Sequence, residues 1–199
     1  MEAPELTLPA AVQQTLETLV SDGHRAVLVG PCVRALLDGH RAPDFQLASS
    51  APAARVLAHC PQAGPIAPRY ATLMVPPPAG PVDVTRFRGG ARLEDELAAR
   101  DFTLDAIAYD PIAEGEPRLV DPEGGLRDLE ANRLRTVGPA RTSLEDDPLR
   151  ALRAARLVAE LPVKPNAELE DAMAAVRGAL PFLRAHRMRQ EISLLFLAP

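Results

Sequence analysis

The spacing of apolar residues in this chain of 199 residues changes near residue 140. Before that point, short apolar runs bounded by glycine, proline or serine predict strands, and apolar residues three and four positions apart predict helices between them. The predicted strands are Ala26–Val29, Phe45–Ala48, Arg69–Val75, Val82–Arg88, Leu119–Val120 and Leu134–Val137. The predicted helices are Ala10–Ser21, one carrying Val33, Leu36 and Leu37, one after Pro52, Leu93–Arg100 and a turn at Leu126–Glu130.

Two segments of this first part match neither a regular strand pattern nor a regular helix pattern. The proline-rich stretch from Pro76 to Pro81 predicts a loop, because proline cannot donate to a strand ladder. The apolar segment Phe102–Tyr109 predicts a buried element but leaves its type open.

After residue 140 the pattern is helical only. Leu149, Leu152 and Leu157 predict one long helix in the segment that begins at Ser143 and breaks at Pro162. Two more helices are predicted at about Ala167–Leu180 and His186–Leu197. The sequence therefore predicts an α+β domain over residues 1–138 and a small all-helical domain over residues 139–199.

Composition places the chain among ordinary globular proteins, with 47% hydrophobic and 25% charged residues. No apolar run reaches the roughly 18 residues of a membrane span, and the N-terminus lacks the positive start of a signal peptide. We therefore expect a cytoplasmic protein without membrane contact. The net charge of −5 excludes a broadly basic surface, so any contact with RNA must be local.

Two aspartates fall in or beside predicted strands. Asp44 precedes the predicted strand that starts at Phe45, and Asp83 lies within the predicted strand Val82–Arg88. Alternating side chains would place both carboxylates on one edge or face of a sheet, as in magnesium-dependent phosphoryl or nucleotidyl transfer. The alternative is a pair of solvated surface acids, and their spacing alone does not decide between the two.

Longer segments carry a family resemblance. Leu28–Gly39 with Asp44–Ser49 resembles the pattern LVGGxVRDxLLG followed by DxDxxT. The segments that resemble the later motifs are Val82–Arg88, Arg100–Tyr109, Asp121–Leu129, Asp146–Arg156 and Arg187–Glu191. In this order they are similar to class II tRNA nucleotidyltransferases, the CCA-adding enzymes and bacterial poly(A) polymerases. The resemblance implies a polymerase β-like mixed-sheet head followed by a helical neck.

The resemblance also implies roles for individual residues. Asp44 and Asp83 would be catalytic and would hold magnesium. Asp147 and Arg150, three apart on a predicted helix and so on one face, would read the edge of the incoming base. Their alternative is a helix-surface ion pair with solvated neighbours. The residues implied in nucleotide binding are Gly30, Arg34, Arg100, Asp101, Asp105, Asp147, Arg150, Arg153 and Arg156. The implied partners are ATP or CTP, tRNA or another RNA, and a further protein.

Several positions depart from the family pattern. Gln46 replaces the second metal-binding aspartate, so the magnesium site should be weakened. Pro31 replaces a glycine of the phosphate-binding turn and offers no N–H. Asp105 replaces an asparagine and should add negative charge near a polyphosphate. The segment after Arg88 is short, and the helical body and tail of full-length members are expected to be absent.

Three functions follow from these observations. The first is a family member that is catalytically impaired and retains nucleotide or RNA binding. The second is an active minimal nucleotidyltransferase that adds nucleotides to RNA 3′ ends, alone or with a partner chain. The third is an interaction scaffold that binds no nucleotide.

Overall fold

The structure is a computed structural model, and it describes residues 3–42, 44–67, 71–76, 81–88, 92–112 and 116–197. Backbone contacts divide the chain into two compact units. The first unit comprises Met1–Ala99 and Asp105–Pro122, and the second comprises Arg100–Leu104 and Glu123–Pro199. The predicted α+β fold is confirmed. None of the helices in the described residues is both long and apolar enough to span a bilayer.

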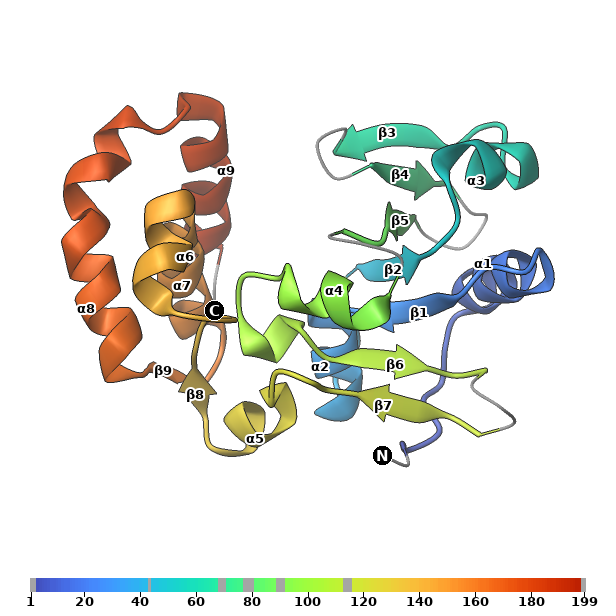
Figure 1. Ribbon diagram of the computed structural model, residues 1–199, viewed down its shortest axis with the longest axis horizontal. Coiled ribbons are helices and arrows are strands. Elements are labelled where there is room, and N and C mark those ends of the chain that lie inside the picture. The colour runs from blue at the N-terminus through green and yellow to red at the C-terminus, as the bar shows by residue number, and fades with distance from the viewer. Residues whose placement is uncertain are drawn as a thin grey trace. The chain divides into compact units, whose positions relative to one another are not determined.

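A seven-stranded mixed sheet forms the centre of the first unit, in the order β3-β4-β5-β2-β1-β6-β7 (Figure 1). Its strands are β1 (Ala26–Val29), β2 (Phe45–Ser49), β3 (Gly64–Ala67), β4 (Thr72–Val75), β5 (Val82–Arg86), β6 (Ala108–Asp110) and β7 (Arg118–Val120). Within the described residues, β2 and β5 run parallel and the other neighbours in this sheet run antiparallel. All four residues of β1 are buried, which explains their uninterrupted apolar run.

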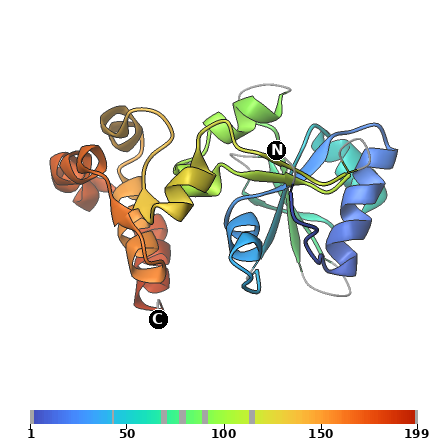
Figure 2. The same ribbon diagram turned by 90° about the horizontal axis from the view of Figure 1, so that it is seen from below.

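Helices cover both faces of this sheet. They are α1 (Ala10–Ser21), α2 (Pro31–Leu37), α3 (Ala53–His59) and α4 (Leu93–Ala98). The apolar residues of α1 repeat at helical spacing, and Val12, Leu16 and Leu19 are buried as the pattern predicts. Figures 1 and 2 show α1 and α2 on one side of the sheet and α4 on the other.

The second unit is mostly helical (Figure 1). Its elements are α5 (Gly125–Glu130), β8 (Arg133–Leu134), α6 (Ala140–Asp146), α7 (Leu149–Glu160), β9 (Lys164–Pro165), α8 (Ala167–Val176), the 3-10 helix η4 (Arg177–Phe182) and α9 (Ala185–Phe196). The side chain of Asn166 caps α8 by accepting a hydrogen bond from the N–H of Leu169 at 3.1 Å. Phe102 and Leu104 pack into this unit's core with Leu134, Leu144 and other apolar residues of α6, α7 and α8.

The sequence pattern misses β3 and the short β9 and overextends other strands. β3 contains Gly64 and Pro65, which are poor strand formers, but it lies at the edge of the sheet, where proline is tolerated. The strand predicted at Arg69–Val75 is β4, which begins at Thr72, and its first two positions lie outside the described residues. Most of the predicted Pro76–Pro81 loop also lies outside them.

The long helix predicted in the segment from Ser143 is instead two helices. α6 ends at Asp146, Asp147 has extended backbone angles (φ −144°, ψ 92°), and α7 begins at Leu149. Proline has no N–H for the helix ladder and disfavours helical angles in the preceding residue, so Pro148 ends α6. The separation of α6 from α7 places Asp147 in a connecting segment rather than on a helix face.

The division into units differs from the expected boundary after residue 138. The segment Arg100–Leu104 belongs to the second unit, although Ala99 and Asp105 on either side belong to the first. Two backbone hydrogen bonds fix this assignment: Thr103 N–H donates to the carbonyl of Arg135, and Val137 N–H donates to that of Asp101. The segment predicted at Phe102–Tyr109 thus contains an extended stretch, the 3-10 turn η2 (Thr103–Asp105) and strand β6.

Candidate functional site

The two predicted catalytic acids come from neighbouring strands of the first unit. β2 and β5 are parallel, and Gln46 is the direct partner of Asp83 in their register. Directly paired residues point to the same face of a sheet, and residues two apart on one strand share a face. Asp44, one residue before β2, therefore shares a face with Gln46 and Asp83, whereas Phe45 and Val82 point to the other. We call Asp44, Gln46 and Asp83 the acid face.

Among the described residues, no cation pairs with the carboxylates of the acid face. Burial raises the pKa of Asp83, and the negative charge of Asp44 raises it further. In the described part of the chain, neither carboxylate has a hydrogen-bond or ion-pair partner. An ionised, half-buried carboxylate beside a second acid is unfavourable unless a cation binds it or a proton neutralises it.

The donor atoms of the acid face fit magnesium better than they fit a transition metal. Two carboxylates and the amide oxygen of Gln46 offer oxygen ligands, which magnesium prefers. The described residues contain no group of three or more histidine, cysteine, aspartate and glutamate side chains that could hold a metal. The donor atoms of the acid face are therefore of the type that magnesium binds.

The turn before α2 has a backbone conformation that depends on glycine. Gly30 has φ 81° and ψ −151°, a region that essentially only glycine adopts. Pro31 follows as the first residue of α2, where a helix makes no use of its missing N–H. Replacement of the glycine by proline therefore removes one donor from the turn without preventing the turn.

Arg34, which is buried, and Asp105, which is half-buried, form an ion pair in the first unit. Nη1 of Arg34 lies 2.5 Å from Oδ1 of Asp105, and Arg34 is 6% exposed. The negative charge that Asp105 adds is paired with Arg34, so each of the two side chains offsets the charge of the other. The two residues are 71 positions apart, so sequence spacing does not reveal the pair.

In the second unit, Asp101 joins two successive turns of α7. Its Oδ1 accepts a hydrogen bond from Nε of Arg150 at 2.6 Å, and its Oδ2 accepts one from Nη1 of Arg153. Arg150 also donates to the carbonyl and hydroxyl oxygens of Ser143, each at 2.9 Å. Burial lowers the pKa of Arg153, but the charges and hydrogen bonds of Asp101 and Glu191 outweigh burial and raise it. Asp101 thus holds two of the predicted nucleotide-binding arginines.

Glu191 completes this cluster, although the sequence pattern assigned it no role. It is 7% exposed on α9, and its two oxygens accept hydrogen bonds from Nε of Arg153 at 2.7 Å and Nε of Arg156 at 3.1 Å. Arg156 also donates to both oxygens of Glu160 at 2.9 Å. The signal that could have found Glu191 is its place in the Arg187–Glu191 motif, where an acid faces the basic helix α7.

Asp147 is held by Arg187 rather than by Arg150. Nη2 of Arg187 donates to Oδ2 at 2.8 Å and Nη1 to Oδ1 at 3.4 Å, while the N–H of Leu149 donates to Oδ1 at 3.3 Å. Burial raises the pKa of Asp147, but these bonds and the Arg187 charge outweigh it and hold the pKa below its ordinary value. The expected placement of Asp147 and Arg150 on one helix face is therefore wrong, since Pro148 separates them into two elements.

We call Asp101, Asp147, Arg150, Arg153, Arg156, Arg187 and Glu191 the arginine network. In the described structure, Nη2 of Arg150 and Nη2 of Arg153 have no hydrogen-bond partner. A carboxylate offers about four acceptor positions, and Asp147 uses three of its own. The network thus retains donors and an acceptor, the combination that a base edge requires.

Each unit therefore gathers part of the predicted residue set. The first unit contains the acid face, the Gly30 turn and the Arg34–Asp105 pair. The second contains the arginine network and Arg100, which is half-buried beside Asp101. No residue of the predicted set lies outside these groups.

Comparison with known proteins places this arrangement in a family. Residues 78–135 match the family described as Poly A polymerase head domain. The chain is 31% identical to a CCA-adding enzyme from Anoxybacillus flavithermus, over 92% of this chain and 49% of the relative. It is 38% identical to an A-adding tRNA nucleotidyltransferase from Deinococcus radiodurans, over 87% of this chain and 40% of the relative.

A solved structure agrees with these matches. The crystal structure of the Bacillus stearothermophilus CCA-adding enzyme in complex with CTP aligns at a TM-score of 0.87 and 30% identity, over 96% of this chain and 50% of that chain. The chain belongs to the tRNA nucleotidyltransferase and poly(A) polymerase family. It spans about half the length of the relatives it matches.

Proposed function

We propose that this member of the tRNA nucleotidyltransferase family binds a nucleoside triphosphate, ATP or CTP, and RNA, and transfers nucleotides poorly or not at all. The observation that carries the proposal is the pairing of Gln46 with Asp83 across β2 and β5. Where a metal pair needs a third carboxylate on this face, the chain has an uncharged amide. The residues proposed to bind nucleotide are present, whereas the negative charge that would hold the metal ions for transfer is reduced by Gln46.

The acid face would hold magnesium through Asp44 and Asp83. A magnesium ion bound there would lower the pKa of an attacking hydroxyl and offset the charge of the triphosphate. With Gln46 in the third position, the metal site loses one negative charge. Loss of several kcal/mol of transition-state stabilisation corresponds to a rate decrease on the order of a thousandfold.

The arginine network would read the base. Nη2 of Arg150 and the remaining acceptor position of Asp147 offer a donor and an acceptor to a base edge. Asp101 and Glu191 hold the guanidinium groups in fixed orientations, so little side-chain entropy is lost when a base binds. Gly30 would allow backbone amides to approach phosphate, and Arg34 and Arg100 would support the sugar and phosphate contacts.

Calorimetric titration with ATP and CTP, with and without magnesium, tests the binding half of the proposal. Extension of a labelled RNA 3′ end tests the catalytic half. Binding with extension at least about a thousandfold slower than in an active relative supports the proposal. Absence of binding to either nucleotide refutes it and favours an interaction scaffold.

A second candidate function is an active minimal nucleotidyltransferase, alone or with a partner chain. The raised pKa of Asp83 favours it, because two mutually repelling carboxylates without a counter-cation are suited to a divalent ion. Extension of the RNA at a rate close to that of an active relative would support this alternative over the impaired enzyme.

A further inference from the structure

The segment from Arg177 to Gln190 has a charge opposite to that of the chain as a whole. It contains four arginines and one histidine but no aspartate or glutamate, in a chain of net charge −5. It comprises η4, the connection and the first part of α9. Positive charge is thus concentrated in one place, as local RNA contact requires.

The arginines of this segment differ in their partners. Arg187 points inward to Asp147, whereas Arg177, Arg184 and Arg189 are exposed. In the part of the chain that the structure describes, these three have no ion-pair partner. The acidic residues of α8 all lie in its first five positions, away from Arg177. Three unpaired arginines on one short segment leave a net positive surface.

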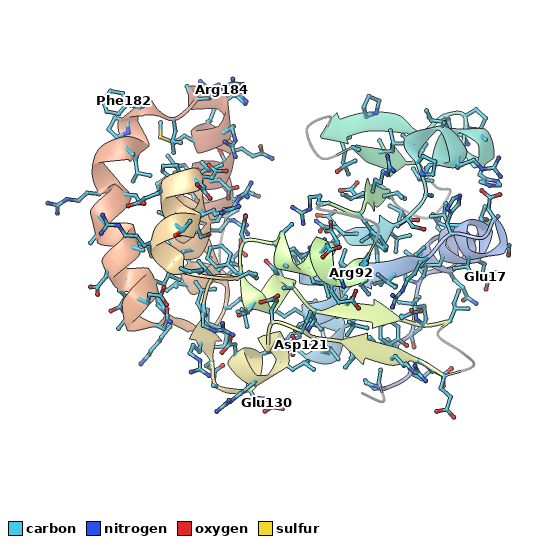
Figure 3. All side chains as sticks on the ribbon, viewed as in Figure 1. Glu17, Arg92, Asp121, Glu130, Phe182 and Arg184 are labelled. Carbon is cyan, nitrogen blue, oxygen red and sulfur yellow. The ribbon has the colours of Figure 1, made fainter. Side chains whose placement is uncertain are left out.

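An exposed aromatic ring lies within the same segment. Phe182 is 88% exposed at the end of η4, two positions before Arg184. Figure 3 shows Phe182 and Arg184 at the same end of the second unit, both directed away from its helices. Phe182 is not part of this unit's apolar core, so core packing does not account for an aromatic side chain at this position.

Charge placement on α9 is unfavourable for the helix itself. The first turn contains no acidic residue, and Arg184, His186 and Arg189 lie at or near its N-terminus. The N-terminal end of a helix carries partial positive charge, so basic residues there destabilise the helix. A bound polyanion would convert this repulsion into attraction.

We propose that Arg177, Phe182, Arg184 and Arg189, together the basic turn, form a docking surface for a single-stranded RNA segment. The arginines contact phosphates, and the Phe182 ring stacks on a base. Arginine clusters with an exposed aromatic ring provide both interactions without sequence readout. The inference rests on the proposed function for the choice of RNA as the polymer, and it adds the location of the contact.

Helix α9 connects the basic turn with the arginine network. Arg187 on α9 holds Asp147 in the network, while Arg184 and Arg189 on the same segment face outward. One helix therefore connects the proposed base-reading residues with the basic turn. RNA held at the basic turn would bias α9, and with it the position of Asp147.

The test measures anisotropy of a fluorescein-labelled single-stranded oligo(U) bound to the full chain across a salt series. The Arg184→Gln/Arg189→Gln variant removes two phosphate contacts, and each contributes about 0.7 to the slope of log K against log salt. The slope should fall by about 1.4, and affinity at 0.1 M salt by about 25-fold. Phe182→Ala should lower affinity by about 5-fold or more, and Phe182→Tyr should retain it.

Arg141→Gln is the matched control. Arg141 is exposed in the same unit, but it is paired with Glu145 and lies outside the basic turn. Its loss should leave the salt slope unchanged. Circular dichroism melting of each variant verifies that the second unit remains folded.

Three results would overturn the docking surface. One is a wild-type chain that does not bind oligo(U). Another is equal RNA affinity and slope for the double variant and Arg141→Gln. The third is stronger binding to anionic phosphatidylserine vesicles than to RNA. ATP and CTP titrations of the same variants separate this failure from failure of the proposed function: a chain that binds nucleotide and RNA, with an RNA affinity and salt slope that the substitutions in the basic turn do not change, refutes the docking surface alone.

Discussion

Replacement of Gln46 by aspartate should restore a third carboxylate to the acid face. Neighbouring strands lie about 4.8 Å apart, so the new carboxylate would be about 5 Å from that of Asp83. Two unit charges at about 5 Å interact with about 3 kcal/mol at an effective dielectric constant of about 20. Asp83 is half-buried, so solvent reduces this figure and about 1 to 2 kcal/mol is expected.

The sign of the effect depends on magnesium. Without the ion, Gln46→Asp should lower the free energy of unfolding, because the added charge repels Asp44 and Asp83. With the ion, the same charge attracts the metal, so the melting temperature of Gln46→Asp should rise more steeply with magnesium than that of the wild type. Extension of RNA should also increase, by up to the thousandfold that the missing charge represents.

Thermal melts in EDTA and across a magnesium series measure the first effect, and extension of a labelled RNA measures the second. Gln62→Asp is the matched control, since Gln62 is exposed in the same unit and lies outside the acid face. If Gln46→Asp and Gln62→Asp respond equally to magnesium, the charge argument fails. A restored metal response without RNA extension would instead identify Pro31 or the short segment after Arg88 as limiting.

Three further predictions concern other charged residues. Asp83→Asn should raise the melting temperature in EDTA at pH 7, because the folded pKa of Asp83 is raised and its ionised form costs stability; the gain should vanish at a pH low enough to protonate Asp83, and a loss at pH 7 would contradict it. Asp22, paired with Arg55 and His59, has its pKa lowered to about 2, so it stabilises the fold above its unfolded pKa of 3.8 and this contribution disappears as the pH falls towards 2. Asp22→Asn should therefore flatten acid denaturation in that range, and an unchanged acid melting curve would refute this. Glu191→Gln should leave Arg153 and Arg156 undercompensated and destabilise the protein by about 3 kcal/mol in urea denaturation, whereas Glu145→Gln, at an exposed pair, should change little.

Local patterns predicted most elements of the fold. The apolar face of α1 and the buried run of β1 follow from spacing alone, and both lie where the sequence predicts them. β3 was missed because Gly64 and Pro65 disfavour strands in isolation, and only its position at the sheet edge makes them tolerable. The break between α6 and α7 was missed although Pro148 marks it in the sequence.

The motifs select the candidate site residues, but they do not predict the partners that the structure gives them. The register of β2 and β5 pairs Gln46 with Asp83. Strand alternation predicts only that Asp44 and Asp83 share an edge or face of the sheet. The Arg34–Asp105 pair joins positions 71 apart. Long-range ion pairs depend on how helices and strands pack, and no local period encodes them. Glu191 was overlooked for the same reason.

The excursion of Arg100–Leu104 into the second unit has a consequence for how this protein can be divided. The polypeptide passes from one unit to the other at residues 99–100, 104–105 and 122–123. A fragment starting at Glu123 would lack Phe102 from its interior and Asp101 from beside Arg150 and Arg153. Neither unit is therefore a contiguous, transplantable module, and gene fusion or truncation at a single point cannot separate them intact.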